Sequence, residues 1–114
     1  MDTRQGMMLR FYVPESARQG GVQLWEWLLQ TGRRLALPGG TALRAVGGFG
    51  RQHVLHESRF VELAGHETIV VEFMLSACEA ESLERELDAA GVSLVCAQWP
   101  LQWRVFNSDC RTAG

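Results

Sequence analysis

The chain has 114 residues, of which 46% are hydrophobic, and this predicts one compact domain that needs neither a disulfide nor a metal ion for stability. A formal net charge of −2 argues against a general nucleic-acid binder, since neutralising phosphates requires a surplus of basic residues. All 11 basic residues are Arg, which excludes a phosphate-binding loop of the kind that needs a lysine.

The cysteines and the N-terminus indicate where the protein is located. Cys78, Cys96 and Cys110 are odd in number and show no CxxC spacing, which favours free thiols in a reducing compartment. No apolar run reaches the length of a membrane span, and the first residues lack the order of a signal peptide. We therefore expect a cytoplasmic protein.

The first half of the chain predicts a strand, a helix and a second strand. Met8–Val13 alternates apolar residues and is a half-buried strand. The apolar positions of Val22–Leu37 follow a helical period, and Gly39 and Gly40 stop that helix. Thr41–Val46 then forms the second strand.

A long connection follows, from Gly47 to His66. A tight hairpin needs only two to five residues, so a segment of this length in a small domain indicates a functional loop. Within it, Phe60–Leu63 could extend a neighbouring strand.

The second half predicts the rest of a sheet and another helix. Glu67–Leu75 is almost continuously apolar and should be the central strand. Ser76–Glu79 has the pattern of a capping box that opens a helix, and Gly91 closes that helix. Ser93–Ala97 is the fourth strand, and the alternation in Leu101–Val105 suggests a short fifth.

This order, β-α-β-β-α-β, predicts an α+β domain of the split βαβ type. Its antiparallel sheet has two helices on one face, and the third strand lies between the first and the second. We place the domain at residues 8–106, with flexible segments at residues 1–7 and 107–114.

The face of the sheet away from the helices then needs a cover. We expect this open face to carry Met8, Arg10, Tyr12, Arg44, Val46, Val70, Glu72 and Met74. Such a patch is too apolar to stay wet in a monomer, so self-association is expected. Glu72 between Arg10 and Arg44 would form a charge layer, as an inter-subunit network that fixes register or as a site for an anion or a proton.

Five pieces of the chain together form a specific pattern: LRFYVPES at Leu9–Ser16, the helix core Trp25–Leu28, GGTALRAVGGFG at Gly39–Gly50, HESRFVELAG at His56–Gly65, and IVVEF at Ile69–Phe73. Through these pieces the chain resembles, from about residue 8 to residue 105, the PII-like family catalogued as domain of unknown function 190.

The resemblance implies a ferredoxin-like fold and a trimer whose sheets face the three-fold axis. It also implies that the long loop corresponds to the partner-binding T-loop of PII signalling proteins. PII proteins hold ATP with a glycine-rich, lysine-containing loop before the last core strand, and here that connection is only Ala89–Val92. Related genes often occur beside fluoride-export channels, which makes a membrane transporter a candidate partner.

The glycine turn is the candidate effector site. Its backbone N–H groups could cradle a small anion such as an adenine nucleotide, with nearby guanidinium groups supplying charge. The residues concerned are Gly47, Gly48, Phe49, Gly50, Arg51 and Arg59. Alternatively, the glycines permit a strand bend or bulge at a crowded subunit contact.

His53, His56 and Glu57 in the loop are candidates for contact with a partner. They also allow a metal-binding alternative, a divalent-cation protein resembling the CutA trimers, because imidazole and carboxylate groups bind zinc and copper. The HxxHE pattern matches no helical zinc motif. In an extended segment the two imidazoles would point to opposite faces, which favours a structural or exposed role.

The sequence carries no pattern of catalytic residues: no GxSxG, no cysteine with evident histidine support, and no paired carboxylates in an obvious cleft. We therefore expect a non-enzymatic trimeric sensor in which an effector changes the order of the loop that engages a partner. The alternatives are the metal-binding trimer and an assembly scaffold without a ligand.

Overall fold

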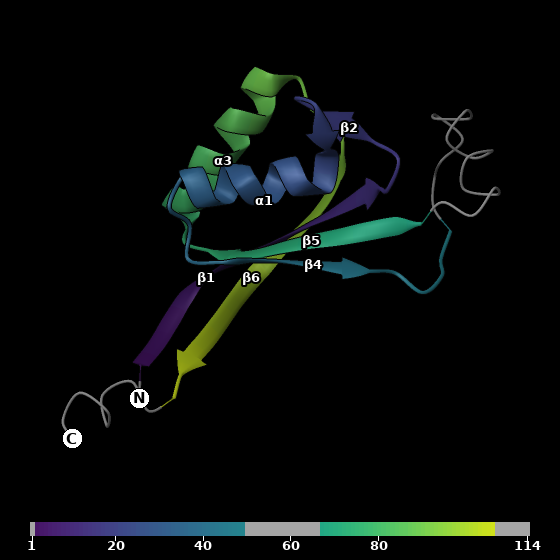
Figure 1. Ribbon diagram of the computed structural model, residues 1–114. Helices are drawn as coiled ribbons and strands as arrows, with labels where there is room; N and C mark the ends of the chain where they lie inside the picture. Colours follow the sequence, from purple (N-terminus) through teal and green to yellow (C-terminus); the bar gives the residue numbers. More distant parts are fainter. Residues whose placement is uncertain (1, 50–66, 107–114) are drawn as a thin grey trace.

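A computed structural model describes residues 2–49 and 67–106. Its elements are β1 (Asp2–Pro14), β2 (Arg18–Gln19), β3 (Val22–Gln23), α1 (Leu24–Arg34), β4 (Gly40–Arg44), β5 (Thr68–Leu75), α3 (Ala77–Ala90) and β6 (Val95–Val105). Both helices lie on the same side of the main sheet (Figure 1). No helix in the described ranges is long and apolar enough to cross a bilayer.

The main sheet has four strands in the order β4-β5-β1-β6, and every neighbouring pair is antiparallel. The third major strand therefore lies between the first and the second, as the sequence predicted. Together with the two covering helices this confirms the α+β, ferredoxin-like architecture. β2 and β3 form a separate small hairpin ahead of α1.

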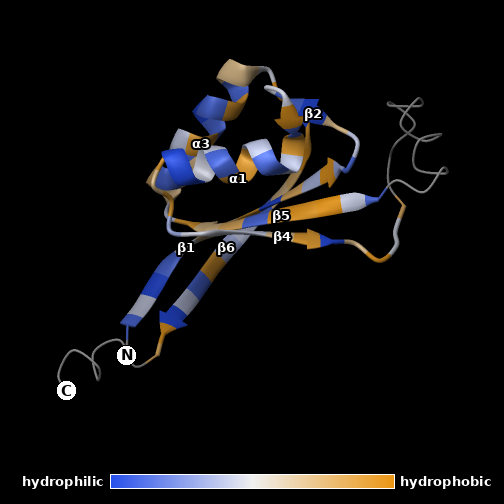
Figure 2. Cartoon of the chain, in the orientation of Figure 1, coloured by the Kyte–Doolittle hydropathy of each residue, from blue (hydrophilic) through white to orange (hydrophobic). Residues whose placement is uncertain are grey.

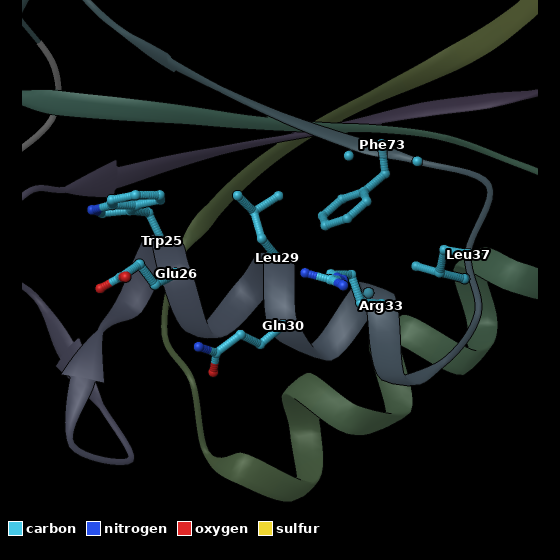
Figure 3. A pocket seen from close by; sticks show the side chains of 10 residues that line it. Trp25, Glu26, Leu29, Gln30, Arg33, Leu37 and Phe73 are labelled. Atoms are coloured by element: carbon cyan, nitrogen blue, oxygen red, sulfur yellow. The ribbon is translucent and has the colours of Figure 1, made fainter.

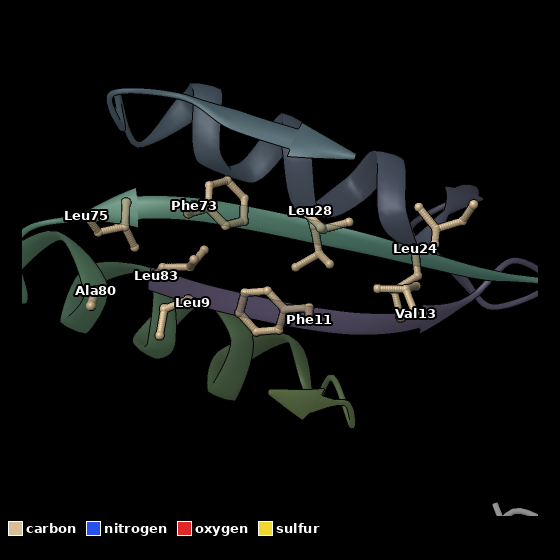
Figure 4. Packing of buried hydrophobic residues seen from close by; sticks show 11 residues of the cluster. Leu9, Phe11, Val13, Leu24, Leu28, Phe73, Leu75, Ala80 and Leu83 are labelled. Atoms are coloured by element: carbon tan, nitrogen blue, oxygen red, sulfur yellow. The ribbon is translucent and has the colours of Figure 1, made fainter. Parts of the chain in front are cut away.

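The hydrophobic core lies between the helices and the inner face of the sheet (Figure 4). Alternate residues of β1 and β5 supply most of it, because side chains alternate between the two faces of a strand. Phe11 and Phe73 meet edge to face with ring centroids 6.2 Å apart. The buried apolar residues are Leu9, Phe11, Val13, Leu24, Leu28, Ile69, Val71, Phe73, Leu75, Ala80 and Leu83.

Helix α3 begins and ends as its sequence predicts. The Ser76 side chain accepts a hydrogen bond from the Glu79 N–H at 3.1 Å, and the Glu79 carboxylate accepts one from the Ser76 N–H at 2.9 Å. This reciprocal pair satisfies donors that the first turn leaves free. At the other end Gly91 adopts a left-handed φ of 71°, which glycine tolerates best.

Helix α1 is shorter than the predicted Val22–Leu37. Residues 22 and 23 pair with 18 and 19 instead, through a turn in which Gly20 and Gly21 have φ values of 58° and 84°. Such a glycine pair allows a tight two-residue hairpin, and the hairpin takes the residues that the helical period alone would have assigned to the first turn.

The two ends of the sheet also differ from expectation. We expected residues 1–7 to be flexible, but Asp2–Met7 belong to β1 and pair with residues 100–105 of β6. We also expected two strands after residue 92, whereas β6 runs without a break from Val95 to Val105. Its proline, Pro100, is accommodated because β6 is an edge strand. Residues 107–114 lie outside the described ranges.

Figure 2 shows hydrophobic residues concentrated along β5, while the outer end of β1 is mostly hydrophilic. Polar composition therefore masked the strand formed by Asp2–Met7. At Gly6 a side chain would collide with the Leu75 carbonyl oxygen and lie 3.2 Å from the Trp103 ring. Glycine therefore permits the close approach of β1 to the end of β5 and to Trp103 of β6.

Candidate functional site

The open face of the sheet carries the central polar pair of the molecule. The Arg10 guanidinium contacts the Glu72 carboxylate through Nε and Nη2, each at 2.7 Å from Oε2. It also lies over the Trp99 ring, 5.0 Å from its centroid. A hydrogen bond with Tyr12, and next the hydrogen bond with Glu72, raise the pKa of Arg10. The guanidinium is thus held by three neighbours on a surface that no described element covers.

Arg44 does not join this pair, which corrects the expected three-residue charge layer. Its Nη1 lies 2.9 Å from Glu15 Oε1 and 2.8 Å from Glu67 Oε1. Hydrogen bonds to these two carboxylates, first Glu67 and then Glu15, raise the pKa of Arg44. Glu72 therefore has one guanidinium partner among the described residues.

The register of β4 explains the difference. Leu43 is opposite Val70 and Thr41 is opposite Glu72, so the odd-numbered residues of β4 lie on the open face. Arg44, opposite Ile69, lies on the other face. The sequence analysis had assigned the even-numbered residues of this strand to the open face. That assignment is off by one residue, and a shift of one residue moves every side chain to the opposite face. Val46, also expected on the open face, lies beyond the strand and is fully exposed.

The open face is nevertheless apolar, as expected. Exposed hydrophobic side chains on it come from all four strands, because residues opposite one another in antiparallel strands share a face. Fractional exposures are 39% for Tyr12, 51% for Leu43, 41% for Met74, 66% for Val95 and 36% for Trp99. This group of five residues, with Arg10 and Glu72, is called the open-face patch below.

The predicted effector site is described only in part. Gly47, Gly48 and Phe49 follow β4, and Phe49 is fully exposed. Gly48 has a φ of 155°, and a Cβ added to either glycine would meet nothing within 4 Å. These residues therefore do not pack against a described element. Gly50, Arg51 and Arg59 lie outside the described ranges.

The strand ends beside the glycine turn are tied together. The Ala45 N–H donates to the Thr68 carbonyl at 2.9 Å, and the Glu15 N–H donates to the Glu67 carbonyl at 2.8 Å. Arg44 adds the two ion pairs described above. The described guanidinium nearest in sequence to the turn is thus already neutralised by two carboxylates, so an anion bound there would depend on backbone N–H groups or on other arginines.

The metal-binding alternative falls on residues that the structure does not describe, since His53, His56, Glu57 and His66 all lie in the undescribed loop. In the described ranges no three His, Cys, Asp or Glu residues are grouped so that they could hold a metal ion. Cys78 and Cys96 are free thiols. Cys96 is exposed, and partial desolvation raises the pKa of its thiol, which disfavours the reactive thiolate form.

A groove beside β4 was not anticipated from the sequence. It has a volume of about 310 Å³ and lies between α1 and the start of β4, with Phe73 at its floor. Figure 3 shows Trp25, Leu29 and Phe73 directed into this space. The sequence features that could have indicated the groove are Gly32 and Gly40, because a Cβ on either residue would lie 2.7 Å from the Phe73 ring. The groove is lined by Trp25, Glu26, Leu29, Gln30, Gly32, Arg33, Leu37, Gly39, Gly40 and Phe73.

The sheet order and the helices on one face define an α+β protein of ferredoxin-like architecture. A family model for DUF190, described as Uncharacterized ACR, matches residues 6–96, and the chain belongs to this family. Among solved structures, the chain resembles one from Thermus thermophilus that is described as a candidate PII-like signaling protein. The two share 17% identity at a TM-score of 0.56, over 96% of this chain and 98% of the other. No curated protein matches the chain.

Proposed function

We propose that this chain is a non-enzymatic, PII-like regulatory protein that acts in the cytoplasm as a homotrimer. The observation that carries the proposal is the open-face patch, within a fold that matches a PII-like signaling protein. Exposed apolar side chains on all four strands, around one ion pair, are typical of a surface that another subunit covers.

In this assembly the three sheets face the three-fold axis, and the Arg10–Glu72 pairs lie near the centre. Covering the patch removes water from each pair, which strengthens the attraction between the two charges and raises the cost of losing either one. The pair then favours one register between subunits over others. Arg44 lies on the other face and stabilises the strand ends beside the loop.

The proposed effector is a small anion, with an adenine nucleotide as the first candidate. Gly47–Gly50 would supply backbone N–H groups, and Arg51 and Arg59 would supply charge. Binding would change the order of residues 51–66, and His53, His56 and Glu57 would contact a partner protein. A membrane transporter such as a fluoride exporter is the proposed partner class, following the resemblance to the family.

Thermal-shift measurements on the full chain test the effector proposal. ATP, ADP and AMP form one set of ligands, and Zn²⁺, Cu²⁺ and Mg²⁺ without nucleotide form the other. A ligand present at about 100 times its Kd stabilises the folded protein by about 2.7 kcal/mol, so binding gives a measurable rise in Tm. We expect a nucleotide to raise the Tm and the metal ions to have no effect.

The matched variant is Arg51→Ala with Gly48→Val, compared with Arg34→Ala on the far side of the domain. The first variant should abolish the nucleotide shift and keep the trimer, while Arg34→Ala should keep both. A rise in Tm with the metal ions alone, lost on His53→Ala with His56→Ala, would contradict the effector proposal and support the divalent-cation alternative. Light scattering on the same samples reports the trimer separately.

A further inference from the structure

The groove beside β4 has the features of a peptide-binding site. Its walls are the half-buried Trp25, Leu29 and Leu37, and its floor is the almost fully buried Phe73. A volume of about 310 Å³ is at the lower end of the range for ligand pockets. The space therefore suits one or two side chains better than a large cofactor.

One rim of the groove carries a guanidinium that pairs with no described residue. In the described ranges, Arg33 is the one arginine whose side chain makes no hydrogen bond, ion pair or ring contact. The other arginines have partners: Arg4, Arg10, Arg34 and Arg44 pair with carboxylates, Arg18 and Arg85 donate hydrogen bonds, and Arg104 contacts Phe106. Arg33 is exposed and lies at the groove, so it is available to an incoming anion.

The strand beside the groove has an edge that no described strand covers. β4 is the outermost strand of the sheet. The Ala45 N–H bonds to Thr68, so residues 41 and 43 also bond to β5, because alternate residues of an antiparallel pair do so. The N–H and C=O groups of Gly40, Ala42 and Arg44 consequently point away from the sheet. They form a row of donors and acceptors along the opening of the groove.

We propose that an extended peptide segment of a partner protein adds to β4 as a fifth strand, with an apolar side chain in the groove and an acidic side chain on Arg33. Main-chain hydrogen bonds to the β4 edge would provide affinity, and the groove would select alternate side chains. The apolar and acidic residues lie two positions apart in the peptide, since only every second side chain of a strand points to the same face.

The charges of the groove also orient the peptide. Glu26 lies about two turns before Arg33 on α1, and its carboxylate makes no ion pair or hydrogen bond with another described residue. The rim is thus negative near the start of α1 and positive near its end. A peptide with a basic residue at one end and an acidic residue at the other complements this rim in one direction only.

A phage-displayed library of random linear peptides, selected on the full chain, supplies the probe. We expect enrichment of sequences with Trp, Phe or Leu two positions from Asp or Glu. Fluorescence anisotropy with an enriched synthetic peptide then gives its Kd. N-methylation of the peptide backbone, one residue at a time, should weaken binding at every second position, because alternate N–H groups face β4.

Two variants test the two halves of the site. Arg33→Glu should weaken peptide binding by about tenfold or more through loss of a charge-assisted bond. Arg34→Glu is the matched control, since Arg34 pairs with Glu86 and does not line the groove, and it should leave the Kd unchanged. Ala42→Pro removes an N–H that the sheet does not use, so it should abolish peptide binding while the circular dichroism spectrum stays the same.

Three results would overturn the proposal. The first is a library selection that enriches no common pattern. The second is an enriched peptide whose Kd changes equally in Arg33→Glu and Arg34→Glu, or whose N-methyl scan has no period of two. The third is a lower molecular mass of Ala42→Pro in solution, which would assign the β4 edge to a second copy of this chain. None of these outcomes depends on nucleotide binding or on the loop at residues 51–66.

Discussion

The two faces of the main sheet are built from the same strands but differ in what covers them. On the inner face Leu9, Phe11 and Val71 are at most 2% exposed, because α1 and α3 pack over them. On the outer face, which is the open face described above, Tyr12 and Met74 alternate with those residues and are 39% and 41% exposed. One chain thus completes one face and leaves the other open.

This difference separates two kinds of stability. The inner face contributes to folding of the single chain, since its apolar area is buried within one domain. The outer face contributes only when a second molecule supplies the cover, so its contribution depends on protein concentration. Substitutions on the inner face should therefore change the free energy of unfolding of the single chain, whereas substitutions on the outer face should change its assembly.

The largest effect is expected for Phe73→Ala on the inner face. Phe73 is 2% exposed and packs edge to face on Phe11, so truncation should cost about 3–5 kcal/mol of unfolding free energy. Urea denaturation measures this loss, which should not vary with protein concentration. The neighbouring variant Met74→Ala, on the outer face, is the control and should cost under about 1 kcal/mol in the dissociated chain. Similar losses for both variants would remove the distinction between the faces.

A charge on the outer face should act on assembly. Met74→Glu places a carboxylate in the open-face patch, where a subunit interface would bury it without a partner. We expect the mass from multi-angle light scattering to fall to one third of the wild-type value at micromolar concentration. Gln98→Glu, on the opposite face of the same sheet, should keep the wild-type mass. A wild-type chain that is monomeric in this measurement would contradict the trimer itself.

The two faces of β1 and β5 were predicted correctly because Met8–Val13 of β1 alternates clearly, and because the one charged residue of the otherwise apolar β5, Glu72, marks its open face. β4 is different: GTALR has five residues and few apolar ones, so the sequence pattern did not show which of its residues lie on which face of the sheet. Arg44 was placed on the wrong face for this reason. The fold class followed from element order, which tolerates such local errors.

Long-range pairing explains most of the remaining differences. Asp2–Met7 is polar and includes a glycine, and it becomes a strand only by pairing with residues 100–105 near the other end of the chain. The groove likewise joins α1, β4 and β5, so no single segment shows it. The proposed effector and partner residues stay predictions, because most of them lie outside the described ranges.

The Arg10–Glu72 pair offers a third test of the outer face. Glu72→Ala leaves Arg10 without its carboxylate, and covering by another subunit makes that loss more costly. We expect a fall in Tm several times that of Glu67→Ala, since the Arg44–Glu67 pair is exposed and such pairs contribute little. Equal falls for the two variants, measured at the same concentration, would mean that the Arg10–Glu72 pair stays in water.

The smallest effect, and the most specific to the inner face, concerns the two glycines around Phe73. Gly32→Ala should gain up to about 1 kcal/mol from helix propensity, since glycine is unfavourable inside a helix. Its Cβ would, however, lie 2.7 Å from a Phe73 ring that Gly40 confines from β4, and overpacking of this kind costs about 1–3 kcal/mol. We expect a net loss of about 1 kcal/mol in urea denaturation.

In a Phe73→Leu background the collision is relieved, so the same Gly32→Ala change should become neutral or stabilising. This reversal of sign is a coupling between residues in contact, which a double-mutant cycle measures directly. If Gly32→Ala has the same effect in both backgrounds, Phe73 does not require the glycine, and the close packing of α1 on the inner face has another cause.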